Sequence, residues 1–188
     1  MSDAVSALNG ARFDGLVSIA DLGPRGMITL RGDLSSAAVK KAVKAVTGTA
    51  TPEQRKIVLA ENHATAWMSP DELLLITPYG ETSAAIAAAE KALAKQHSMV
   101  AEVSDARASF SISGNRSREV LAKLIPVDLS PGAFGVGEIR RTHCAQVPAA
   151  VWMTEPDSFE LVCFRSVAQY VFDLLKAAAA EGSEVDAF

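Results

Sequence analysis

Apolar residues dominate several short stretches of the chain, and these stretches predict β-strands. Near the start of each half two such stretches lie close together, at residues 16–20 with 27–31 and at residues 99–103 with 109–113. We expect the two members of each pair to lie side by side as antiparallel strands. Residues 141–147 predict an additional strand.

Other segments carry apolar residues at every third or fourth position, the spacing of one face of a helix. Asp33 and Ser35 precede the first of these segments, and Asn115 and Ser117 precede its counterpart in the second half. Their side-chain oxygens make them candidate helix caps. Further helices are expected at residues 83–96 and 166–180, and the tail at residues 181–188 is expected to fray.

A motif near the end of each half is repeated. Residues 67–77 read WMSPDELLLIT and residues 152–162 read WMTEPDSFELV, with one residue inserted in the second copy. Proline favours the first corner of a tight turn, so each copy predicts a hairpin, the second with one extra residue in its loop. The repeat is too long for a solenoid and implies a duplicated unit.

These patterns predict the α+β class, with two pseudo-twofold-related units of the order β-β-α-β-β-α. Antiparallel sheets with helices on one face fit this order, whereas a doubly wound parallel sheet does not. We expect residues 1–188 to form a single compact domain built of pseudo-repeats at about 14–98 and 99–180.

Composition narrows the possible functions. The chain has 188 residues, 49% of them hydrophobic and 21% charged, and its formal net charge is −4. A protein that binds nucleic acid normally shows a basic excess or a basic stripe, and this sequence shows neither. Its apolar runs are too short to cross a membrane. We therefore expect a cytoplasmic protein that binds neither nucleic acid nor membrane.

The histidines and cysteines do not form a recognisable reactive centre. His63, His97 and His143 are far apart in the sequence, and His143 and Cys144 are adjacent residues of a predicted strand, which point to opposite faces. Cys144 and Cys163 lie in apolar stretches, so we expect buried, reduced thiols. A reactive Cys144, with its pKa lowered by neighbouring arginines, is the alternative.

Two further segments are candidates for ligand binding. Gly132, Gly135 and Gly137 are spaced like a nucleotide loop, but the run follows a helix and enters a strand, the reverse of the dinucleotide fingerprint, so we interpret it as a flexible connection. Arg140 and Arg141 form a candidate contact for an anion or a protein partner, because paired guanidinium groups bind carboxylates and phosphates. A solvated strand end, or a salt bridge that faces a protein partner, is the simpler interpretation of the two arginines. No catalytic, cofactor-binding or metal-binding residue is predicted.

The second half of the chain resembles a known family. Residues 124–134, LIPVDLSPGAF, and residues 141–149, RTHCAQVPA, followed by the Trp152 segment, look like the gamma subunit of heterotetrameric sarcosine oxidase. The Trp67 segment and the total length fit as well. The first thirty residues match the family only loosely.

The resemblance implies a complex with alpha, beta and delta subunits that oxidatively demethylates sarcosine. It also implies that FAD, FMN, NAD and tetrahydrofolate sites belong to the alpha and beta subunits and zinc to the delta subunit, with no cofactor on this chain. The fold of the family is similar to the folate-binding part of aminomethyltransferases, which is itself built from two related halves.

Two hypotheses follow. In the first, the chain is a non-catalytic subunit that assembles and stabilises the oxidase. In the second, it is a free-standing folate-binding or one-carbon transfer protein, in which Arg140 and Arg141 hold the glutamate tail of the folate.

Overall fold

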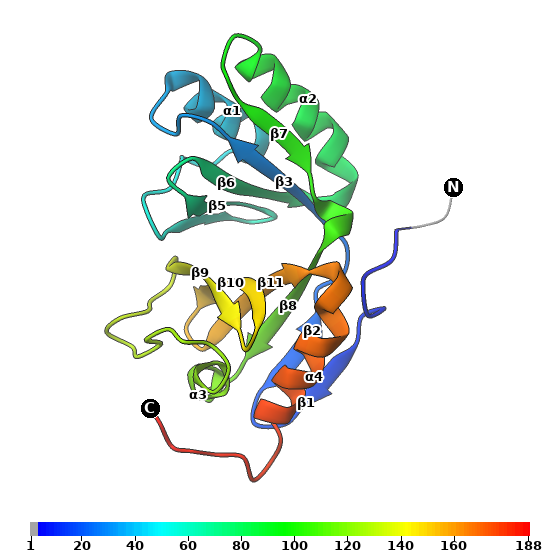
Figure 1. Ribbon diagram of the computed structural model, residues 1–188, viewed down its shortest axis with the longest axis vertical. Helices are drawn as coiled ribbons and strands as arrows, with labels where there is room; N and C mark the ends of the chain where they lie inside the picture. Colours follow the sequence, from blue (N-terminus) through cyan, green and yellow to red (C-terminus); the bar gives the residue numbers. More distant parts are fainter. Residues whose placement is uncertain (1–3) are drawn as a thin grey trace. The chain divides into compact units, whose positions relative to one another are not determined.

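The computed structural model describes residues 4–188, which divide into two compact units (Figure 1). One unit comprises residues 25–104, and the other comprises residues 4–24 together with residues 105–188. Each unit has its own sheet and its own hydrophobic core. Every strand pair within the described residues is antiparallel, so the predicted α+β class with antiparallel sheets is confirmed.

The unit at residues 25–104 has a five-stranded sheet with two helices. Its elements are β3 (Arg25–Arg31), α1 (Ala37–Thr47), β4 (Ile57–Ala60), β5 (His63–Ser69), β6 (Glu72–Pro78), α2 (Thr82–Leu93) and β7 (Met99–Glu102). The strand order is β4-β5-β6-β3-β7. Leu30, Leu73 and Leu75 pack with Val39 and Val43 of α1 in the core of this unit.

The other unit has a six-stranded sheet. Its elements are β1 (Arg12–Asp14), β2 (Ser18–Asp21), β8 (Arg107–Ser113), α3 (Ser117–Ala122), β9 (Ile139–Cys144), β10 (Val147–Glu155), β11 (Ser158–Phe164) and α4 (Ala168–Ala178). The strand order is β1-β2-β8-β11-β10-β9. Phe110, Phe134 and Phe159 lie in its core. The ring centroids of Phe134 and Phe159 are 5.8 Å apart.

The two units repeat one arrangement. The order β4-β5-β6-β3-β7 corresponds to β9-β10-β11-β8-β2, with β1 added at the edge. Three strands therefore lie between the two helices of each half. The predicted β-β-α-β-β-α order has only two strands there. The additional strands, β4 and β9, lie at the edges of their sheets, and β9 overlaps the additional strand that residues 141–147 predict.

The predicted pairing of the opening strands is wrong. β2 pairs with β8 instead of β3, and β7 pairs with β3 instead of β8, so each half contributes its opening strand to the sheet of the other half. At the end of β2 the carboxylate of Asp21 accepts a hydrogen bond from the amide of Gly23, whose φ of 76° lies in the left-handed region that favours glycine. The chain then passes through Pro24 into β3 and so leaves the first sheet.

Both predicted hairpins are present, but the extra residue is not in the second loop. β5 and β6 are joined by Pro70 and Asp71, and β10 and β11 by Pro156 and Asp157. Each hairpin has a register shift just before its turn. Counted from the turns, Trp67 corresponds to Met153, so the two tryptophans do not occupy equivalent positions.

The helices differ from the predictions mainly at their ends. Ser36, rather than Asp33 or Ser35, caps α1 by accepting a hydrogen bond from the amide of Val39 at 3.2 Å. No side chain caps the start of α3, so Asn115 and Ser117 do not have the predicted role. Fraying of residues 181–188 stays a prediction. In the structure this tail has no regular secondary structure, but side chains from the α3 region bind it.

Candidate functional site

The structure does not bring Arg140 and Arg141 together. They are successive residues of β9, paired with Val151 and Ala150 of β10, and therefore point to opposite faces of the sheet. Arg140 donates hydrogen bonds to the Glu138 carboxylate at 2.7 Å and to the carbonyl of Ile139 at 2.9 Å. A forked grip on one anion by both guanidinium groups is not available in this arrangement.

Arg140 makes its contacts within its own unit and stabilises the fold there. Its guanidinium lies 5.3 Å from the centre of the Phe134 ring, and its ion pair with Glu138 is largely shielded from solvent. The Arg140 side chain therefore lies over the edge of the core, at the point where the connection from α3 enters β9. Arg141 is exposed.

The histidines remain apart in the structure. His97 and His143 are exposed, and Nε2 of His63 lies 3.2 Å from a carboxylate oxygen of Glu81. Within residues 4–188, no three histidine, cysteine, aspartate or glutamate side chains gather in a way that could hold a metal ion.

Both cysteines are free and buried, as the sequence predicted. Burial raises the pKa of the Cys144 thiol to about 11. Burial, and to a smaller extent the neighbouring Cys144, raises the pKa of the Cys163 thiol to about 12, with Arg107 opposing the shift. A thiolate is the reactive form of cysteine, so the alternative of an activated Cys144 is wrong.

The glycine-containing segment is anchored at two points. It belongs to the connection between α3 and β9, in which Leu129 and Phe134 are fully buried. Arg118 of α3 donates hydrogen bonds to the carbonyls of Leu129 and Phe134. The predicted flexible connection is therefore held at its base. Nothing in the sequence spacing singles out Arg118 for this role.

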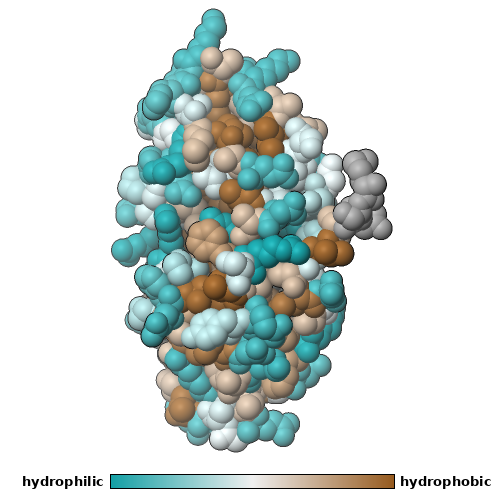
Figure 2. Space-filling model, turned by 45° about the vertical axis from the view of Figure 1, so that its right-hand side comes forward, coloured by the Kyte–Doolittle hydropathy of each residue, from teal (hydrophilic) through white to brown (hydrophobic). Residues whose placement is uncertain are grey.

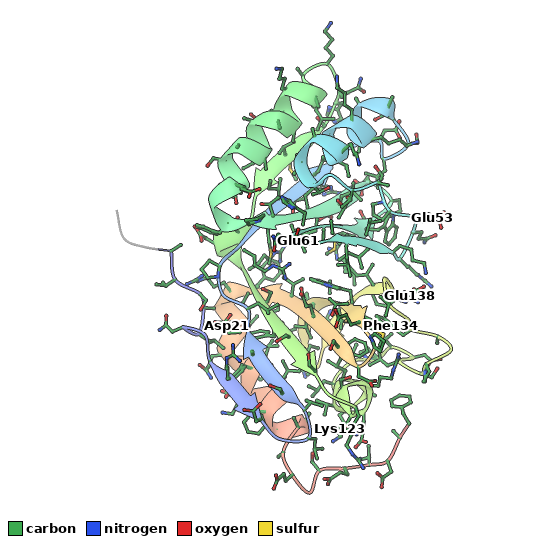
Figure 3. All side chains as sticks on the ribbon, turned by 180° about the vertical axis from the view of Figure 1, so that it is seen from behind. Asp21, Glu53, Glu61, Lys123, Phe134 and Glu138 are labelled. Atoms are coloured by element: carbon green, nitrogen blue, oxygen red, sulfur yellow. The ribbon has the colours of Figure 1, made fainter. Side chains whose placement is uncertain are left out.

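The buried carboxylate of Glu119 is the centre of an ion cluster that the sequence did not predict. This carboxylate accepts hydrogen bonds from Arg116 at 2.8 Å and from the amide of Val185 at 2.7 Å, and Lys123, labelled in Figure 3, lies 3.7 Å away. The Val185 amide, and next the charge and hydrogen bond of Arg116, lower the pKa of Glu119 despite its desolvation. The i,i+3 and i,i+4 spacing of these charges was the available signal.

Several apolar side chains are exposed on the surface of the described residues. No helix among residues 4–188 has the length and the apolar character that crossing a membrane requires. On the face drawn in Figure 2, polar side chains surround smaller apolar areas. The large apolar side chains that are exposed include Val136 in the α3–β9 connection, Phe164 at the end of β11 and Tyr170 on α4.

Comparison with known proteins gives consistent matches. The family described as sarcosine oxidase, gamma subunit family matches residues 31–181. The sarcosine oxidase subunit gamma of Corynebacterium sp. (strain P-1) is 33% identical over 158 residues, which cover 83% of this chain and 75% of that protein.

Two solved structures have similar folds. A chain of the heterotetrameric sarcosine oxidase from Corynebacterium sp. U-96, in complex with pyrrole 2-carboxylate, matches with a TM-score of 0.82 and 25% identity, covering 94% of this chain and 91% of that one. The glycine cleavage system aminomethyltransferase T from Bartonella henselae matches with a TM-score of 0.61 and 14% identity, covering 82% of this chain and 44% of that one. The second likeness concerns the fold alone.

Proposed function

This chain belongs to the sarcosine oxidase gamma subunit family, and on that basis we propose that it is the gamma subunit of a heterotetrameric sarcosine oxidase and that it assembles and stabilises the enzyme. The observation that carries the proposal is the structural match to a chain of such an oxidase over nearly its whole length. The internal pairing of Arg140 with Glu138, and of Arg116 and Lys123 with Glu119, supports a structural role.

The proposed complex contains alpha, beta and delta subunits besides this chain. It demethylates sarcosine oxidatively to glycine, and the one-carbon unit passes to tetrahydrofolate or leaves as formaldehyde. We assign FAD, FMN, NAD, tetrahydrofolate and zinc to the partner subunits and none of them to this chain. We also place the complex in the cytoplasm, where thiols such as Cys144 and Cys163 stay reduced.

Omission of the chain tests the proposed role. The four subunits are co-expressed with and without it, and the purified products are compared for subunit content, sarcosine oxidation and thermal inactivation. We expect the preparation without this chain to be incompletely assembled, or to lose activity at a lower temperature. An intact oxidase of equal activity and equal stability in its absence would reject an assembly role.

The alternative is a free-standing folate-binding or one-carbon transfer protein, which the fold likeness to aminomethyltransferase T favours. The opposite orientation of Arg140 and Arg141 removes the arginine pair on which that hypothesis relied. Calorimetry of the isolated chain with tetrahydrofolate discriminates between the two. We expect no binding heat at millimolar ligand, and a saturable heat would establish the alternative.

A further inference from the structure

Charged side chains bind the tail, residues 181–188, to the α3 region. Figure 1 shows the tail leaving the end of α4 and turning towards α3. Three contacts hold it: Lys123, labelled in Figure 3, donates to the carbonyl and hydroxyl oxygens of Ser183, Glu119 accepts the amide hydrogen of Val185 at 2.7 Å, and Arg116 donates to the carboxylate of Asp186 at 3.0 Å. These contacts give the tail a defined place on α3 without regular secondary structure.

Apolar packing does not hold the tail. The side chains of Val185 and Phe188 are 60% and 57% exposed. Among the described residues, the apolar side chains that pack against the core of this unit include none from residues 181–188. Salt screens charge interactions at a protein surface, whereas it does not weaken the burial of apolar side chains. The attachment of the tail therefore depends on ionic strength.

The N-terminal segment, residues 5–11, gives an internal comparison. A buried carboxylate holds it too, because Asp21 accepts hydrogen bonds from the amides of Leu8 at 3.3 Å and Gly10 at 3.1 Å. Ala7, Leu8 and Ala11 also pack against the core of the unit. The two segments thus share one kind of polar contact and differ in apolar packing. Screening should release the tail and leave the N-terminal segment in place.

Glu119 keeps two partners when the tail leaves. Its carboxylate lies 2.8 Å from Arg116 and 3.7 Å from Lys123, and both cations belong to the α3 region. Loss of a partner is strongly destabilising when it leaves a buried charge unpaired, and here the charge of Glu119 stays paired. The side chain of Asp186 is 80% exposed, so its pair with Arg116 stabilises the closed tail only weakly. The tail can therefore open at low cost.

We propose that the tail is a latch that opens from α3 and closes again while the rest of its unit stays folded, and that ionic strength sets the balance between the two states. The closed state is the one in the structure. In the open state, the Glu119 carboxylate is exposed on α3 and residues 183–188 are free of it. Local opening of this kind occurs where few apolar contacts resist it. The inference does not depend on the proposed function.

The test compares two amides that both donate to a buried carboxylate. Exchange of the Val185 and Gly10 amides in the full chain is followed by NMR, with amides of β8 as a measure of global unfolding. Each rate is expressed relative to a short peptide of the same local sequence in the same buffer. Sodium chloride is raised from about 0.05 M to about 1 M, at which charges are screened beyond about 3 Å.

Two variants of the tail accompany the salt series. Asp186→Asn removes the carboxylate that Arg116 binds, and Glu184→Gln is the matched control, because it removes the same charge at an exposed position two residues away. Neither change touches α3 or the core.

We expect salt to speed exchange of the Val185 amide about fivefold and to leave the Gly10 and β8 amides within about twofold. Asp186→Asn should speed Val185 exchange about threefold at low salt, and Glu184→Gln should leave it nearly unchanged. Val185 exchange that is as slow as that of β8 and independent of salt would mean that the tail opens only on global unfolding, which would overturn the proposal. Equal acceleration of Val185 and Gly10 by salt, or equal rates in the two variants, would also overturn it.

Discussion

Burial determines the behaviour of the two cysteines. Their raised pKa values mean that the folded chain keeps both thiols protonated at a pH where the unfolded chain, with an ordinary thiol pKa near 9.0, ionises them. The folded state therefore binds more protons than the unfolded state above pH 9. Stability that is fully present below that pH is lost as the pH rises toward the folded-state values.

We predict that the free energy of unfolding falls between pH 9 and pH 11, with Cys144 contributing up to about 3 kcal/mol of the loss. Cys144→Ala lowers stability at neutral pH through lost packing but flattens this alkaline slope. Urea unfolding at a series of pH values measures both effects. An unchanged slope in the variant would show that Cys144 is not the titrating group.

Glu119 changes the stability with pH in the opposite direction. Its pKa is lowered in the folded state, so its contribution is present above the ordinary carboxyl pKa of 4.5 and is lost as the pH falls through the folded value. We predict that Glu119→Gln lowers the thermal midpoint by several degrees at pH 7 and speeds amide exchange at residues 185 and 186, which Glu119 and Arg116 bind. Asp173→Asn, at an exposed position of α4, is the control and leaves both quantities nearly unchanged.

At the scale of elements, the cap of α1 gives a direct test of local structure. Ser36 accepts the hydrogen bond from Val39, whereas the hydroxyl of its neighbour Ser35 donates to Asp33. We predict that Ser36→Ala costs about 1 kcal/mol in the free energy of unfolding. Ser35→Ala should cost clearly less, and chemical denaturation of the two variants measures the difference. Equal losses would contradict the assignment of Ser36 as the cap.

The exchange of opening strands makes a second prediction. Ile19 of β2 is fully buried in the same core as Phe110 of β8 and Val171 of α4. We predict that Ile19→Ala costs about 2 to 5 kcal/mol and speeds hydrogen exchange in β8 and α4 more than in β3. Mass spectrometry of the exchanged peptides measures this pattern. Faster exchange in β3 instead would support the local pairing that the sequence suggested.

The elements themselves were more predictable than their partners. The apolar pattern located β3, β8 and the hairpin strands, each of which has several consecutive buried residues. It could not show that β2 lies beside β8, since a strand pattern specifies which face is buried and not which strand is the neighbour. Ser36 was missed because three polar residues at the helix start all carry an oxygen suited to capping.

The candidate site was less predictable than the fold. Arg140 and Arg141 were noticed as neighbours in sequence, but their orientation on opposite faces follows once they are placed in β9. Arg118 donates hydrogen bonds to the carbonyls of Leu129 and Phe134, which are distant in the sequence. The residues around Arg118 therefore do not predict these contacts.

At the scale of the whole molecule, duplication supplies two units with the same strand order, and their surfaces have diverged. In the unit that contains residues 105–188, Glu119 and Glu138 form ion pairs with arginines of the same unit. A protein of this kind fits a role in holding larger partners together better than one in binding a small ligand alone.

Native mass spectrometry of the complex purified through a tag on this chain tests the central claim most directly. The account predicts a heterotetramer that contains this chain together with three different subunits, and flavin absorbance in the same fraction. The chain eluting by itself, without flavin, from cells that express all four subunits would contradict it.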